Sequence, residues 1–317
     1  MKQITIHYLP HTRPHFCELM FYFLNKVKPE NKEKLMLNIY THDLNFFRQA
    51  VPQLLSGIEC NIIHMSPAYM DKINVITTKL DTPYSVKLDE DIFISNHLWD
   101  YMIENVGLLD DDENLILAPL LSCGIPTGEY FIDGYFDADR KKELHDTFLR
   151  FGFGKDGVPV NPWGWDMTFI NRLTTGAGSW DGAAWLEETN NIPHHYKGYH
   201  PLRNGYETHR KLNELILDDV GKLVTKNDYS VFPVKNRYYT NSMFFVKSET
   251  WLKILTDRSL YRDGFDEVPL NLYMQNNNLN YLFVKEGYAI HTMYNTNIKP
   301  GEDNEFYQQL KNRMMSV

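Results

Sequence analysis

Three consecutive acids, Asp89, Glu90 and Asp91, are the residues of this chain whose types and spacing best suit chemistry. They follow a short β-rich run, 84–88, and precede the apolar residues 92–94. Side chains in extended backbone alternate between two faces, so Asp89 and Asp91 are expected to point the same way. Two carboxylates held close together repel each other and form a hard-oxygen site for a divalent cation. The alternative is a strand that ends in a solvated acidic turn, because D-x-D alone is a weak pattern.

The segments around these acids predict a sheet that would position them. Apolar periodicity predicts strands at 3–8, 35–40, 60–65 and 84–88, and helices at 16–27, from Leu44 onward and at 69–80. Alternation of strands and helices implies right-handed crossovers and a mainly parallel sheet. Ligands of open α/β sheets bind at the carboxyl ends of the strands, which is where Asp89 and Asp91 are expected.

Neither common phosphate-binding loop is present at a suitable place. The sequence has no G-x-x-x-x-G-K-[ST], and its one G-x-G-x-x-G, at 152–157, follows the helical run 141–151 instead of a strand. We interpret those glycines as a loop. Without a glycine cradle, a bound diphosphate would need a metal ion to neutralise it, and Asp89 and Asp91 are the candidates to hold that ion.

The segment 71–94, DKINVITTKLDTPYSVKLDEDIFI, resembles the donor-binding half of GT-A-type glycosyltransferases. In that family a helix carrying Lys and Asn leads through a turn into a strand that ends in a D-x-D motif. The N-terminal stretch ITIHYLPHTRPHFCELMFYFL resembles the family's first strand, polar loop and first helix. The resemblance covers most of the first half of the chain and, more loosely, the last fifth. It implies a GT-A-like (Rossmann-like) α/β fold, with a mixed, mainly parallel sheet flanked by helices.

The resemblance also implies donor-binding residues in the first half. Arg13, in the loop after the first strand, is placed to stack on a base or reach a diphosphate, or is simply a surface arginine. Asp43 follows the second strand, where the family often contacts base or ribose, although we favour an N-cap role for it. Lys72 and Asn74 stand as in the family's nucleotide-facing helix. Asp89 is expected to contact the metal or the donor ribose.

Weaker matches near the end of the chain imply the sugar pocket and the third metal ligand. The segment 237–246, predicted as a strand, resembles the part of the family that lies beneath the donor sugar. Asn241 and Ser242 stand there in place of the usual glycines. In the family a C-terminal histidine completes the metal site, and His291, after the predicted strand 281–284, occupies that place. A histidine after a strand is otherwise more often structural.

The segment 265–271 resembles the acidic motif that supplies the catalytic base of inverting family members. That base must come within hydrogen-bond reach of the acceptor hydroxyl, so Asp266 or Glu267 is the candidate. Either acid could instead be an N-cap or a first-turn acid that is favoured by the helix dipole.

The middle region, about 152–210, changes composition and matches no family that we can name. Its tryptophans could form an acceptor platform or supply the core of an irregular subdomain; they are Trp163, Trp165, Trp180 and Trp185. We predict a donor-binding half at 1–150 and an acceptor-side half at 151–317 that contains this aromatic-rich insertion. The two halves are expected to pack as one compact unit.

Composition sets outer limits on the function. The chain has 317 residues, 43% of them hydrophobic, and a formal net charge of −9. This negative charge argues against a protein that binds nucleic acid through its overall charge. Three widely spaced cysteines fit a reducing compartment. No apolar run approaches the length of a membrane span. We therefore expect a cytoplasmic protein, in the cytoplasm of the host if a phage encodes it.

Together with these observations, the resemblance implies a glycosyltransferase that depends on Mn²⁺ or Mg²⁺, bound by Asp89, Asp91 and His291. The sugar, a hexose or pentose, would pass with inversion from a nucleotide sugar, with UDP as the favoured carrier, to a hydroxyl of a glycan or of modified DNA. One alternative is a glycosyltransferase acting on hydroxymethylated bases of phage DNA. Alternatives from other classes are a non-catalytic nucleotide-sugar binding protein and a metal-dependent nucleotide-sugar diphosphate hydrolase.

Overall fold

The computed structural model describes residues 2–124, 127–151, 206–235, 237, 239–260, 267–292 and 302–317. Several residues singled out in the sequence lie outside these ranges. They are the glycine-rich loop at 152–157, Trp163, Trp165, Trp180, Trp185 and the candidate base Asp266.

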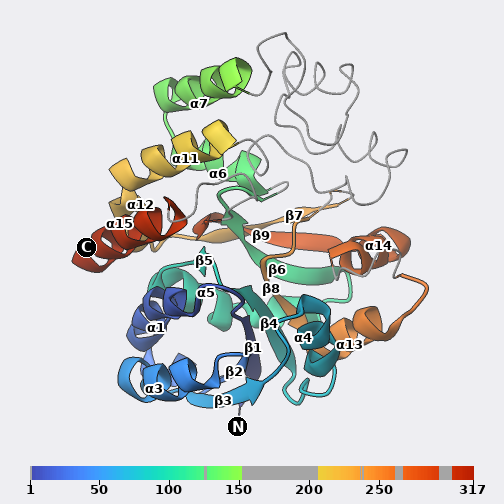
Figure 1. The fold of residues 1–317 in the computed structure, drawn as a ribbon. Coiled ribbons are helices and arrows are strands. Elements are labelled where there is room, and N and C mark those ends of the chain that lie inside the picture. The colour runs from blue at the N-terminus through green and yellow to red at the C-terminus, as the bar shows by residue number, and fades with distance from the viewer. Residues whose placement is uncertain are drawn as a thin grey trace.

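One sheet forms the centre of the described part of the chain, with nine strands among the described residues (Figure 1). Its order is β3-β2-β1-β4-β8-β6-β9-β5, and β7 also pairs with β9. The strands are β1 (Ile4–Leu9), β2 (Leu35–Thr41), β3 (Glu59–His64), β4 (Tyr84–Asp89), β5 (Ile92–Phe93), β6 (Asn114–Leu121), β7 (Ser230–Val234), β8 (Met243–Lys247) and β9 (Asn280–His291).

Strand directions bring several strand ends to one edge of this sheet. β1, β2, β3 and β4 are parallel, β8 is antiparallel to both β4 and β6, and β6 is parallel to β9. The short strands β5 and β7 run antiparallel to β9. Consequently β1, β4, β6 and β9 all end at the edge where β8 begins. We call this edge, marked by Leu9, Asp89, Leu121, His291 and Met243, the carboxyl rim.

Helices lie on both faces of the sheet: α1, α3 and α5 on one, α4 and α13 on the other (Figure 1). The helices are α1 (Cys17–Lys26), α2 (Pro29–Lys32), α3 (Leu44–Leu54), α4 (Tyr69–Ile76), α5 (Asn96–Glu104), α6 (Thr127–Tyr135), α7 (Ala138–Phe151), α11 (Tyr206–Asp218), α12 (Val220–Thr225), α13 (Ser248–Thr256), α14 (Glu267–Asn277) and α15 (Glu302–Ser316). None of the helices in the described ranges has the length and apolar character needed to cross a bilayer.

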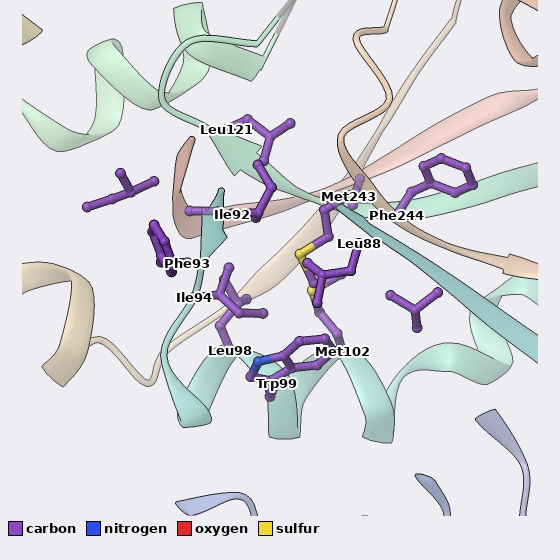
Figure 2. Packing of buried hydrophobic residues seen from close by; sticks show 14 of the residues in the cluster. Leu88, Ile92, Phe93, Ile94, Leu98, Trp99, Met102, Leu121, Met243 and Phe244 are labelled. Carbon is purple, nitrogen blue, oxygen red and sulfur yellow. The ribbon is translucent and has the colours of Figure 1, made fainter. Parts of the chain in front are cut away.

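Apolar residues on either side of the three acids anchor them to the core. Leu88, before the acids, and Ile92 and Phe93, after them, are each at most 3% exposed. They pack among side chains of α5, β6 and β8, including Trp99 and Met243 (Figure 2). Each such side chain contributes about 1.5–3 kcal/mol through burial. The acidic turn is therefore held in place by buried residues before it and after it.

The predicted fold class is confirmed: the protein is mixed α/β, with a mainly parallel sheet flanked by helices. The four predicted strands of the first half are present, with ends shifted by a residue. The predicted strand at 237–246 is wrong over its first part, because only Met243–Lys247 is paired in the sheet. Conversely, the strand predicted at 281–284 is too short. β9 continues to His291 and pairs with β5 there.

Candidate functional site

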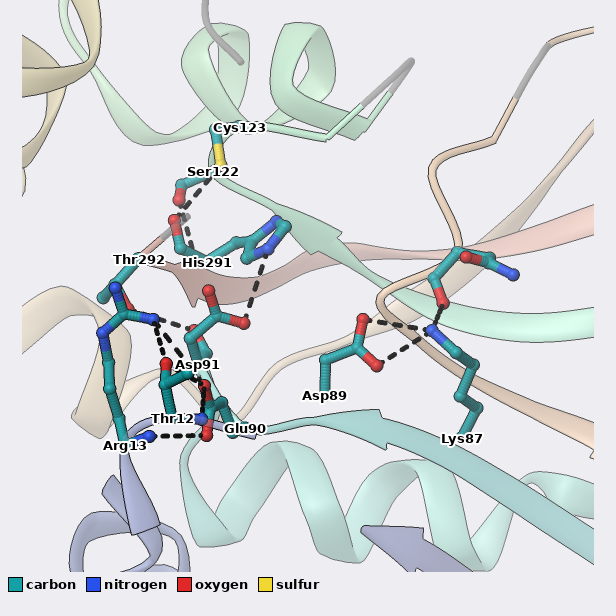
Figure 3. A network of polar contacts seen from close by, with 11 residues as sticks. Thr12, Arg13, Lys87, Asp89, Glu90, Asp91, Ser122, Cys123, His291 and Thr292 are labelled. Carbon is teal, nitrogen blue, oxygen red and sulfur yellow. Dashed lines mark hydrogen bonds and ion pairs between the residues drawn. The ribbon is translucent and has the colours of Figure 1, made fainter. Parts of the chain in front are cut away.

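The carboxyl rim gathers most of the residues that the sequence proposes. Asp89 ends β4, the loop that contains Arg13 follows β1, and His291 ends β9. Asn241 and Ser242 precede β8, which starts at the same rim because it runs antiparallel to its neighbours. Segments that are far apart in the sequence thus converge on the three acids (Figure 3).

The extended strand that was expected to carry both Asp89 and Asp91 ends at Asp89. β4 ends at Asp89, and Glu90 and Asp91 form the turn that leads into β5. The alternation of an extended strand therefore does not continue to Asp91. Figure 3 shows Asp89 facing Lys87 and Asp91 facing His291. Each acid consequently has its own set of contacts.

Asp91 lies against His291 because β5 pairs with the end of β9. Ile92 is in register with His291, and the Thr292 amide donates to the Asp91 carbonyl at 3.0 Å. The Asp91 Oδ1 lies 3.6 Å from the His291 Nε2, with side chains 15% and 6% exposed. Ser122, the residue after β6, accepts the His291 amide through its Oγ at 3.1 Å.

The charge on Asp91 is poorly compensated. Burial, together with the neighbouring charges of Asp89 and Glu90, raises the pKa of Asp91 to about 7, and Arg13 only partly opposes this. A carboxylate with so high a pKa is one that a cation would stabilise.

Glu90 organises the loop after β1. Its carboxylate accepts the backbone amides of His11, Thr12 and Arg13, at 2.6, 3.1 and 3.0 Å. The Arg13 guanidinium adds an ion pair to Glu90 at 3.6 Å, with its side chain 25% exposed. Three successive amides aimed at one anion form a concave anion-binding arrangement, which a carboxylate of the chain itself occupies here.

Asp89 is paired with a lysine from its own strand. Both oxygens of Asp89 accept from the Lys87 ammonium at 3.0 Å, and that ammonium also donates to the Asn241 carbonyl at 2.7 Å. The Asp89 amide donates to the Ser242 carbonyl at 3.0 Å. These bonds connect the end of β4 to the turn before β8, where Asn241 and Ser242 are both buried.

Three other proposed donor residues have different surroundings. Lys72, on α4, is buried and donates to the Pro10 carbonyl beneath the loop after β1. Burial lowers the pKa of Lys72, against the opposing influence of Glu90 and Asp89. Asn74 is exposed on the same helix. Asp43 caps α3 by accepting the Phe46 amide at 3.0 Å, which confirms its predicted N-cap role.

Glu267 begins α14. Asn271, one turn later, donates to the Tyr239 carbonyl at 2.9 Å and accepts the Tyr239 amide at 2.7 Å. Burial raises the pKa of Tyr239, and the charges of Asp89 and Glu267 add to that effect. The two hydrogen bonds of Asn271 therefore link α14 to the segment that precedes β8.

The donor atoms at the carboxyl rim fit a divalent cation only in part. Among the described residues, no three His, Cys, Asp or Glu side chains are gathered as a metal-binding group. Asp91 and His291 nevertheless supply a carboxylate oxygen and an imidazole nitrogen, which Mn²⁺ accepts, and the raised pKa of Asp91 marks negative charge that a cation would offset. A cation held by this pair would take its other ligands from water and a diphosphate.

A separate hollow of about 520 Å³ lies at the opposite ends of the strands. Tyr84 at the start of β4, Lys247 at the end of β8 and Leu252 of α13 are part of its lining. None of the candidate site residues lines it, so it is distinct from the carboxyl rim.

Two residues of the rim were missed at the sequence level. In the sequence, Lys87 reads as one residue of a β-rich run and Glu90 as the spacer of D-x-D. A charged residue between Val86 and Leu88 in a central strand is a signal that could have identified Lys87, because lysine is almost never fully buried unless paired. No sequence signal indicates that Glu90 would bind the loop after β1.

Comparisons with known proteins complete the description. No protein-family model matches the chain, and no curated protein matches it in sequence. Among solved structures, the chain is similar to GalNAc-T7, solved with UDP, GalNAc and Mn²⁺, at 10% identity and a TM-score of 0.41. It is also similar to residues 1–349 of TarS from S. aureus, at 9% identity and a TM-score of 0.40.

These alignments cover 92% of this chain and 44% of the GalNAc-T7 chain, and 99% of this chain and 72% of the TarS chain. The chain thus spans less than half the length of the GalNAc-T7 chain.

Proposed function

We propose that this chain is a glycosyltransferase that moves a sugar from a nucleotide-sugar donor to an acceptor hydroxyl with the help of a divalent cation. The observation that carries the proposal is the approach of Asp91 to His291. Two residues separated by most of the chain lie 3.6 Å apart at the carboxyl rim. That rim is where ligands of open α/β sheets bind.

The residues of the rim have distinct proposed roles. Asp91 and His291 would hold Mn²⁺ or Mg²⁺, and Asp89 would contact the donor from its fixed place beside Lys87. When bound, the cation supplies Lewis-acid stabilisation of the departing diphosphate. The Arg13 guanidinium, one-quarter exposed beside Glu90, would add positive charge near the diphosphate. Lys72, beneath the loop after β1, supports the shape of that loop.

Inversion requires a base on the acceptor side. Glu267, at the start of α14, is our proposed base, with Asp266 as the second candidate. Its carboxylate would accept the proton of the attacking hydroxyl while the diphosphate leaves from the opposite side of the sugar. The link between α14 and Tyr239 supports this, because it ties Glu267 to the turn that precedes Asn241.

A panel of nucleotide sugars tests the function directly. Thermal unfolding would be measured with each nucleotide sugar in Mn²⁺, in Mg²⁺ and in EDTA, and products would be separated by HPLC. A donor at about a hundredfold above its Kd stabilises the fold by about 2.7 kcal/mol. We expect one group of donors to give this stabilisation, and to be consumed when an acceptor is present, only with the divalent cation.

Variants connect that activity to the rim. Asp91→Asn and His291→Gln should each lower turnover by on the order of a hundredfold, since each removes a proposed ligand of the cation that stabilises the leaving group. Asp112→Asn is the matched control, because that acid is fully exposed in the turn before β6. Full activity in Asp91→Asn would reject the proposed metal site. Full activity in both Asp266→Asn and Glu267→Gln would remove both acids from the role of base.

The same assays separate the alternative functions. Donor consumption at an equal rate without acceptor indicates a hydrolase, and tight binding without turnover indicates a binding protein. A DNA acceptor would show steeply salt-dependent binding to a duplex that contains hydroxymethylated bases.

A further inference from the structure

Lys87 is a buried cation in the middle of the sheet. Its side chain is 1% exposed, and it lies on β4 between the buried residues Val86 and Leu88. An ammonium group has three donor hydrogens. Three acceptors surround it at hydrogen-bond distance, the two oxygens of Asp89 and the carbonyl of Asn241.

Burial of this charge is costly for the fold. Removing an ammonium from water is unfavourable, and a buried ion pair is often no more stable than packed apolar residues of similar volume. An apolar residue would suit the centre of β4 at least as well. The sheet alone therefore gives no reason for a lysine at this position.

The surroundings of Lys87 give a reason that belongs to the site. Asp89, Glu90 and Asp91 follow it in the chain after Leu88, so three acidic residues lie within four positions of this ammonium. Through Asp89 and Asn241, one ammonium both offsets part of this charge and joins the end of β4 to the turn before β8 (Figure 3).

We propose that Lys87 is a positioning residue of the site, a built-in cation that fixes Asp89 and the 241–242 turn and sets how much negative charge the carboxyl rim offers to a divalent cation. Asp89 acts in this arrangement as the partner of Lys87 and not as a metal ligand. The inference rests on the proposed function, since it concerns the same cation and the same diphosphate.

A double-mutant cycle on the full chain, read out by ligand binding, tests the proposal without any turnover measurement. Lys87→Met, Asp89→Asn and the double variant would be compared with the wild type. Mn²⁺ alone would be titrated by electron paramagnetic resonance. Inorganic pyrophosphate without metal would be titrated by calorimetry, as a probe of the diphosphate group that does not depend on the donor's base. Lys226→Met is the matched control, because Lys226 pairs with Glu286 and neither residue lies at the carboxyl rim.

The expected effects have opposite signs. Lys87→Met leaves Asp89 without its counter-charge, so Mn²⁺ should bind on the order of tenfold more tightly and pyrophosphate on the order of tenfold more weakly. Asp89→Asn should weaken Mn²⁺ binding by a similar factor. The double variant removes a neutral pair, so its Mn²⁺ affinity should return to within about threefold of the wild type.

Other outcomes would overturn the proposal. If Lys87→Met binds both probes as Lys226→Met does, Lys87 has only a structural role, while the proposed function stands. If Asp89→Asn loses Mn²⁺ and the double variant does not recover it, Asp89 is itself a ligand. Should Lys87→Met fail to fold, the double variant is compared with Asp89→Asn, and equal Mn²⁺ affinities reject the proposal. A wild type that binds neither probe and consumes no nucleotide sugar rejects the proposed function as well.

Discussion

Glu90 shows how a single charge orders a loop of the candidate site. Its carboxylate accepts the amides of His11, Thr12 and Arg13 and is only 7% exposed. Hydrogen bonds to a charged group contribute about 1.5–3 kcal/mol each, against about 1 kcal/mol for neutral pairs. Glu90→Gln keeps the shape and removes the charge. We expect it to lower the free energy of unfolding by about 2 kcal/mol and to speed hydrogen exchange at the three amides.

Glu113→Gln is the control for this experiment, because Glu113 is exposed in the turn before β6. Its urea midpoint and its exchange at residues 11–13 should match the wild type. Unchanged exchange at those three amides in Glu90→Gln would show that the loop keeps its shape without the carboxylate.

His7 gives the stability of the protein a dependence on pH. It is fully buried in β1, where Nδ1 lies 2.8 Å from the Tyr40 hydroxyl, and burial lowers its pKa to about 3. The unfolded chain has the ordinary pKa of about 6.5 and therefore binds this proton more readily than the folded chain does. The contribution of His7 is complete above about pH 6.5 and is lost as the pH falls towards 3. At pH 5 the loss amounts to about 2 kcal/mol.

We expect His7→Gln to lack this part of the acid sensitivity. Urea unfolding at pH 7.5 and at pH 5 would be compared with the wild type and with His42→Gln, which changes an exposed histidine. The difference between the two pH values should shrink by about 2 kcal/mol in His7→Gln only. An equal difference in all three proteins would mean that His7 takes up no proton on unfolding in this range.

At the scale of elements, an irregular stretch interrupts the pairing of β9 with β6 before the last part of the strand. Its pairing with β6 passes from Ala118 opposite Phe283 to Leu120 opposite Tyr288, so the intervening residues of β9 leave the regular ladder. Pro119 stands opposite this stretch and has no amide to donate. The stretch contains Glu286, at a φ of 60°. The last part of β9, which ends at His291, follows this change of register.

Gly287 in that stretch packs too closely for a side chain. A Cβ at this position would lie 2.6 Å from the Val284 Cγ1 and 2.9 Å from the Leu98 Cδ1. Gly287→Ala should therefore cost about 1–3 kcal/mol in the free energy of unfolding, because the packed core must shift. Gly221→Ala is the control, since nothing lies within 4 Å of a Cβ there and α12 should gain up to about 1 kcal/mol. Equal midpoints for the two variants in urea would contradict this account.

Local patterns in the sequence were enough to predict the first four strands, the cap of α3 by Asp43 and the general position of the acids. Each of these depends on residues near one another in the chain. The antiparallel entry of β8 between β4 and β6 and the full length of β9 depend on pairing between distant segments, which periodicity does not report. For the same reason the partners of Glu90 and Lys87 were missed, and the departure of Asp91 from the strand could not be anticipated.

For the molecule as a whole, the helix α15 packs against residues that follow β1 and residues that follow the acidic turn. The ring of Tyr307, on α15, stacks on the ring of Phe16 with 4.1 Å between the ring centroids. The centroid of the Phe93 ring lies 5.6 Å from that of Tyr307. The Tyr307 hydroxyl donates to the His15 carbonyl at 3.0 Å. Phe16 follows the loop held by Glu90, and Phe93 follows the acidic turn. One buried ring therefore supports both segments.

Tyr307→Ala should lower the free energy of unfolding by about 3–5 kcal/mol, the usual cost of deleting a large buried aromatic side chain. Tyr307→Phe keeps the ring and loses the hydroxyl, so it should cost only about 1 kcal/mol. Met315→Ala, at an exposed position of the same helix, should stay within about 0.5 kcal/mol. If Tyr307 supports the site, hydrogen exchange in Tyr307→Ala should quicken at residues 11–16 and 91–94 together. Faster exchange confined to α15 would mean that the helix can loosen while the carboxyl rim stays in place.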